Sequence, residues 1–74
     1  MVLIAINQEE FWNLRKSRTG EITVNVDREI KEDDEMILMT ESMCKIFCVI
    51  TSVINIDESR VKVKYKIYGE QITN

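Results

Sequence analysis

The sequence contains no histidine and no proline, and only two glycines and two cysteines among its 74 residues. Histidine is the side chain whose ordinary pKa lies near neutral pH, so the chain has no ready general base. Two thiols without an imidazole cannot complete the four-ligand shell of a structural zinc site. The two glycines form no phosphate-binding loop. We therefore expect no metal site and no cofactor.

The side-chain combinations that most enzymes use are also missing. The serines have no histidine to activate them, and the largest group of carboxylates lies in a charged run at residues 27–35 that we interpret as an exposed loop. Proton-transfer catalysis needs positioned groups whose pKa values are matched to the reaction. The sequence therefore predicts that the protein is not an enzyme.

The cysteines and the apolar runs bear on the cellular compartment. Cys44 and Cys48 lie in an apolar run, and free cysteine is often buried, so we interpret both as reduced core thiols. Within one extended strand their Cα atoms would lie about 13 Å apart, too far for a disulfide. Residues 1–6 are too short for a signal sequence, and no run approaches the length of a membrane span. We expect a cytoplasmic protein, in the host cytoplasm if a phage encodes it.

The chain does contain enough apolar residues for one core, at 45% of its composition. A chain of this length makes one domain at most. We expect a single compact domain over residues 1–68 and a frayed C-terminal tail over residues 69–74.

The predicted elements are one helix and five strands. Asn7 is a good N-cap, and Glu10 completes the capping box of a helix over about residues 8–18. Gly20 is a plausible stop for this helix. The pattern favours an α+β fold, in which a small five-stranded, mostly antiparallel sheet or barrel follows the order β-α-β-β-β-β. The expected strands cover residues 2–6, 21–26, 36–40, 43–54 and 60–68.

Residues 60–68 have the most informative pattern in the chain. Basic and apolar residues alternate there, and alternate strand residues point to opposite faces. The pattern predicts one cationic row on a surface, which we call the Lys row. It either protects a solvated sheet face from aggregation or binds an anion such as the phosphates of nucleic acid. The Lys row consists of Arg60, Lys62, Lys64 and Lys66.

Basic and aromatic residues elsewhere could extend the Lys row. Near the predicted helix end lie Arg15, Lys16 and Arg18. Tyr68 should share the face of the Lys row, and an aromatic beside basic groups is used to bind single-stranded nucleic acid. Trp12 either covers a sheet edge or forms an exposed platform for a base or a partner.

The acidic run at residues 27–35 could oppose the Lys row. It lacks the residue order of a calcium-binding loop, and we interpret it as a solvated loop. It could instead fold across the Lys row, or face a basic protein partner. Its acidic residues beyond Asp27 are Glu29, Glu32, Asp33, Asp34 and Glu35.

Three segments carry a resemblance to a known family. Residues 11–15 (Phe-Trp-Asn-Leu-Arg) form an early helix, residues 30–38 are similar to an apolar-x-x-Gly-Asp-x-apolar-apolar pattern, and residues 46–53 suit the next strand. Together they resemble the PUA-like superfamily, which includes the ASCH, EVE and YTH modules. Asp33 stands where the family usually has glycine. The resemblance implies a small barrel that binds RNA, DNA or a modified base.

Two functions remain open from the sequence. The first is a non-catalytic nucleic-acid-binding module that uses the Lys row and the basic helix end. The alternative is an accessory or inhibitor protein, possibly phage-encoded, that acts by protein–protein contact. The oligomeric state is not predicted, and no membrane partner is expected.

Overall fold

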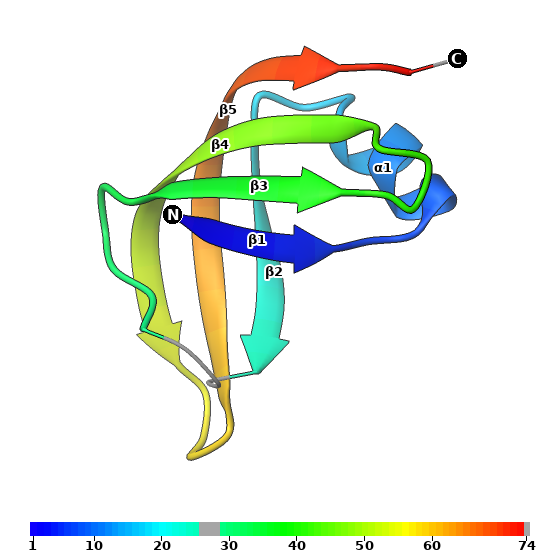
Figure 1. Cartoon of the computed structure of the whole chain (residues 1–74). Helices are drawn as coiled ribbons and strands as arrows, with labels where there is room; N and C mark the ends of the chain where they lie inside the picture. Colours follow the sequence, from blue (N-terminus) through cyan, green and yellow to red (C-terminus); the bar gives the residue numbers. More distant parts are fainter. Residues whose placement is uncertain (26–28, 74) are drawn as a thin grey trace.

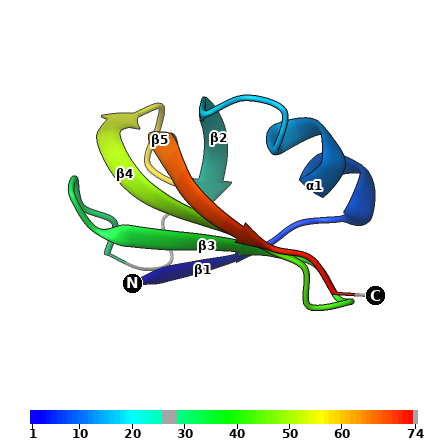
Figure 2. The ribbon, with the colours of Figure 1, turned by 90° about the horizontal axis from the view of Figure 1, so that it is seen from above.

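Five strands curl into a half-barrel, and one short helix lies against its inner face (Figures 1 and 2). This is a computed structural model, which describes residues 1–25 and 29–73. The strands lie in the order β1-β3-β4-β5-β2 across the sheet. The predicted strand position Val26, and residues 27 and 28 of the acidic run, lie outside the described part. The elements are β1 (Val2–Ala5), α1 (Gln8–Leu14), β2 (Thr19–Asn25), β3 (Glu35–Met39), β4 (Lys45–Asn55) and β5 (Arg60–Gln71).

The sheet is mixed, which corrects part of the predicted architecture. β3–β4, β4–β5 and β2–β5 are antiparallel pairs, whereas β1 runs parallel to β3. An antiparallel neighbour can follow through a short hairpin, but a parallel neighbour needs a long crossover. Here α1 and β2 form that crossover, so β1 joins the sheet at the edge far from β2. The sheet therefore forms a half-barrel with β1 and β2 as its outermost strands.

The helix begins where the sequence predicts and ends earlier. The side-chain oxygen of Asn7 accepts a hydrogen bond from the backbone N–H of Glu10 at 2.7 Å. The carboxylate of Glu10 accepts one from the backbone N–H of Asn7 at 3.2 Å, which confirms the capping box. The helix ends at Leu14 rather than near residue 18, and residues 15–18 form a turn that leads into β2. The carbonyl of Arg18 accepts the N–H of Ile67 at 2.6 Å.

Gly20 is part of β2 and not a helix stop. It lies opposite Tyr65 in the sheet, and the Tyr65 ring packs over it. A Cβ on Gly20 would lie 2.5 Å from the hydroxyl oxygen of Tyr65. Glycine is therefore needed at this position for close packing of an aromatic ring.

The core lies between α1 and the inner face of the sheet. Alternate residues of β3, β4 and β5 are buried there, together with Phe11 from the helix. Both cysteines are free and buried, in agreement with the interpretation as core thiols. The largest fully buried side chains are those of Tyr65, Phe11, Met36, Leu38, Ile46, Ile50, Val63, Cys44 and Cys48.

The last strand runs beyond its predicted end at residue 68, and Asn74 of the predicted tail lies outside the described residues. β5 continues to Gln71, and the hydroxyl of Thr73 donates to the carbonyl of Ser42 at 2.5 Å. Register shifts at Phe47/Cys48 and Ile50/Ser52 allow β4 and β5 to bend. Each of these two long strands therefore contributes to both halves of the curved sheet (Figure 1).

Candidate functional site

The Lys row lies on the outer face of β5, the face away from α1. Val61, Val63 and Tyr65 are buried on the inner face, so the alternating basic residues point outward. Arg60, Lys64 and Lys66 are exposed, and Lys62 is half-buried. The alternation predicted from the sequence thus places the four basic residues in one row. Their neighbours across β2 in the register are Asn25, Thr23, Glu21 and Thr19.

The members of the Lys row differ in their ion pairs. Arg60 donates two hydrogen bonds to one carboxylate oxygen of Asp57, at 3.0 and 2.8 Å, and lowers the pKa of that carboxyl group. Lys62 lies 4.0 Å from the carboxylate of Glu21. Lys64 and Lys66 have no ion-pair partner among residues 1–25 and 29–73. Within the described structure, two adjacent ammonium groups of the row thus remain unpaired.

The described part of the acidic run, residues 29–35, contacts the N-terminus and β4 rather than the Lys row. The carboxylate of Asp34 lies 3.1 Å from the N-terminal ammonium group, which lowers the pKa of Asp34. Lys31 pairs with Glu29 at 3.2 Å. The backbone of the run pairs with β4, because the N–H of Asp33 donates to the carbonyl of Ile50 at 2.8 Å. No carboxylate in residues 29–35 forms an ion pair with the Lys row.

The basic residues that follow the helix lie in two different environments. Arg15 donates to both carboxylate oxygens of Glu70, at 2.6 and 2.8 Å, which raises the pKa of Arg15 and lowers that of Glu70. Arg15 also lies over the Trp12 ring at 5.0 Å. Lys16 and Arg18 are exposed. Since Arg18 is hydrogen-bonded to β5 through its carbonyl group, its backbone adjoins the last lysine of the row.

The two candidate stacking residues lie in different places. Tyr68 is 55% exposed, and its ring centre is 6.2 Å from that of Phe47. Phe47 lies between two buried positions of β4, so it and Tyr68 share the outer face with the Lys row. Trp12 is 42% exposed and packs edge-on against Phe11. Tyr68 therefore extends the Lys row, whereas Trp12 belongs to the helix surface beside Arg15.

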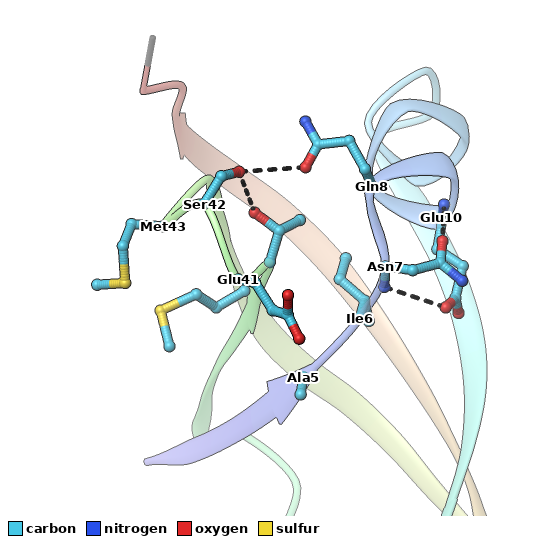
Figure 3. A pocket seen from close by; sticks show the side chains of 10 residues that line it. Ala5, Ile6, Asn7, Gln8, Glu10, Glu41, Ser42 and Met43 are labelled. Carbon is cyan, nitrogen blue, oxygen red and sulfur yellow. Dashed lines mark hydrogen bonds between the residues drawn. The ribbon is translucent and has the colours of Figure 1, made fainter.

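The structure also contains a groove that the sequence patterns did not indicate. One wall is the link between β1 and α1, and the other is the end of β3 with the turn that follows it (Figure 3). The groove has a volume of about 760 Å³. Strand alternation could not reveal it, because its walls come from segments about 35 residues apart in the chain. Its lining residues are Ala5, Ile6, Asn7, Gln8, Glu10, Met39, Thr40, Glu41, Ser42 and Met43.

The two buried thiols have different environments. Hydrogen bonding with the backbone of Thr73 lowers the pKa of Cys44 to about 7. Burial raises the pKa of Cys48 to about 12. Cys48 lies opposite Ile67 in the sheet but is buried on the inner face, and Cys44 is also buried, so we assign both thiols to the fold rather than to the outer-face Lys row.

Comparisons with known proteins identify no relative. No family model, no curated protein and no solved structure matches this chain. The PUA-like resemblance therefore stays a prediction. The described part of the chain has no helix that is long and apolar enough to cross a membrane. Within that same part, no group of three or more histidine, cysteine or acidic side chains could hold a metal ion.

Proposed function

We propose that the protein is a non-catalytic module that binds single-stranded nucleic acid along the outer face of β5. The observation that carries this proposal is the arrangement of Lys62, Lys64 and Lys66 in one outward row. Two of the three have no carboxylate partner among the described residues. A row with two unpaired lysines attracts phosphates even though the whole chain carries a net charge of −3.

The spacing of the Lys row suits a nucleic-acid backbone. Side chains at every second strand position lie about 6.5–7 Å apart, which is close to the separation of adjacent phosphates in one strand. Contacts of this kind supply affinity without sequence preference. The row thus favours a backbone-directed interaction rather than readout of base edges.

The position of Tyr68 favours single strands over duplexes. Tyr68 follows the Lys row on the same face and packs beside Phe47. Unpaired bases can stack on an exposed aromatic ring, whereas the bases of a duplex are already stacked. A single-stranded ligand could therefore contact the lysines through its phosphates and Tyr68 through a base. The PUA-like resemblance adds the expectation that the preferred base is a modified one.

A salt series of fluorescence-anisotropy titrations tests the proposal. A labelled oligothymidine should bind more tightly than a duplex of equal length. For about four phosphate contacts, the plot of log K against log salt concentration should have a slope of about −3 for single strands. Absence of binding at tens of micromolar protein in low salt, or a slope near zero, would contradict the proposal.

A further inference from the structure

Hydrogen bonds link the two walls of the groove beside the β3–β4 turn. At one end, the N–H of Ile6 donates to the carbonyl of Met39 at 2.9 Å. At the other end, the hydroxyl of Ser42 donates to the side-chain oxygen of Gln8 at 3.2 Å, and it lies 2.9 Å from the hydroxyl of Thr40 (Figure 3). These contacts fix the separation of the walls, so the groove is formed before any ligand arrives.

The lining of the groove combines an apolar surface with negative charge. Ala5, Ile6 and Met39 provide aliphatic and thioether surface. Both ionisable residues of the lining are acidic, namely Glu10 and Glu41, and no described lysine or arginine lines it. A groove of this composition is complementary to a ligand that has an apolar stem and a cationic head group.

Glu41 is the carboxylate best placed to receive a cation. It is exposed in the β3–β4 turn, and its carboxylate lies between the two walls on the side of Ile6 (Figure 3). It forms no ion pair within residues 1–25 and 29–73. Glu10 already accepts the N–H of Asn7 in the capping box, so it adds negative charge but has less freedom to move.

Met43 has an unusual backbone conformation for its residue type. Its φ angle is 71°, in the left-handed region where side chains other than glycine and asparagine are disfavoured. The turn places its side chain on the far side from Gln8 (Figure 3), where it is 49% exposed. A strained position that holds an exposed thioether at the edge of a groove is consistent with a contact residue, since methionine adapts to varied partners.

We propose that this groove binds a basic segment of a partner protein by inserting one lysine or arginine side chain. The aliphatic stem of that side chain lies on Ile6 and Met39, and its head group pairs with Glu41. Met43 contacts an apolar neighbour in the same segment. The proposal does not depend on nucleic-acid binding, because none of the groove residues belongs to the Lys row.

A peptide titration of the intact protein, followed by backbone chemical shifts, tests this proposal. The probe is a capped peptide of alternating leucine and arginine, compared with a matched peptide in which citrulline replaces arginine. The arginine peptide should shift the resonances of residues 5–8 and 39–43 and should bind about fivefold more tightly than the citrulline peptide. Equal binding of the two peptides, or shifts confined to residues 29–35, would overturn the proposal.

Two pairs of variants test the assigned roles. Glu41→Gln should weaken binding of the arginine peptide about fivefold, whereas Glu58→Gln in the β4–β5 turn should leave the affinity of the protein for this peptide unchanged.

Met43→Gly should also weaken binding of the arginine peptide. The thermal midpoint of unfolding should stay equal or rise in this variant, because glycine relieves the left-handed conformation. Asp33→Gly is the control for that relief, since Asp33 has a φ angle of 68° and lies outside the groove. Wild-type affinity in both Glu41→Gln and Met43→Gly would overturn the proposal.

Discussion

At the scale of single residues, the contact between Tyr65 and Gly20 shows how one position constrains another. The ring of Tyr65 is 1% exposed, and its hydroxyl group is buried with no hydrogen-bond partner in the described structure. Alternation in residues 60–68 was enough to predict that this side chain points inward. It could not predict that the ring would pack over Gly20, because that contact depends on the pairing of β2 with β5.

Removal of the Tyr65 hydroxyl should stabilise the protein. A buried hydroxyl without a partner has lost its hydrogen bonds to water, so Tyr65→Phe should raise the free energy of unfolding by about 1 kcal/mol. Gly20→Ala should lower it by about 1–3 kcal/mol in the wild type, because the ring must move. Urea denaturation of both variants checks these values. A loss of stability in Tyr65→Phe would show that the hydroxyl has a partner.

Cys44 predicts a pH dependence of stability with a defined sign. The folded-state pKa of Cys44 is about 7 against an ordinary value of 9.0, so the folded protein releases this proton first. The resulting stabilisation is fully present above pH 9 and is lost as the pH falls through 7. The urea midpoint of the wild type relative to Cys44→Ser should therefore rise from pH 7 to pH 9. A difference between the two proteins that does not change over this range would contradict the pKa assignment.

At the scale of elements, local patterns predicted where most elements lie but not how they end or pair. The N-cap and the strand alternation depend on residues close in the chain, and Asn7 and Glu10 form the capping box that they predict. The helix ends early, and the carbonyl of Arg18 instead accepts a hydrogen bond from the N–H of Ile67 in β5. That contact joins segments about 50 residues apart, so no local pattern contains it. The parallel pairing of β1 with β3 was missed for the same reason.

The capping box gives a direct test at this scale. Asn7→Ala should lower the free energy of unfolding by about 1 kcal/mol, because the N–H of Glu10 loses its acceptor. Asn13→Ala, within the same helix, is the matched control. It should have little effect or a small stabilising one, since alanine is the better helix former. Equal losses in the two variants would indicate a general effect of asparagine removal rather than capping.

At the scale of the whole molecule, the curved sheet separates two surfaces of opposite character. The Lys row lies on the outer face of β5, and the groove with its two glutamates lies at the end of β3. The sequence was sufficient to predict the row, since it belongs to one strand. It was not sufficient to predict the groove, or the position of the acidic run beside the N-terminus, because both depend on strand order. An uneven charge distribution along the chain thus becomes two distinct surfaces only through the fold.

The central claim is that the Lys row, through its unpaired lysines, binds nucleic acid, and a matched pair of charge reversals tests it most directly. Lys66→Glu reverses a row member that has no described ion-pair partner, whereas Lys31→Glu reverses a lysine paired with Glu29 outside the row. Both variants change the net charge equally. We predict that Lys66→Glu weakens oligothymidine binding about tenfold and makes the salt dependence less steep, while Lys31→Glu has a much smaller effect. Equal affinities of the two variants would contradict the claim.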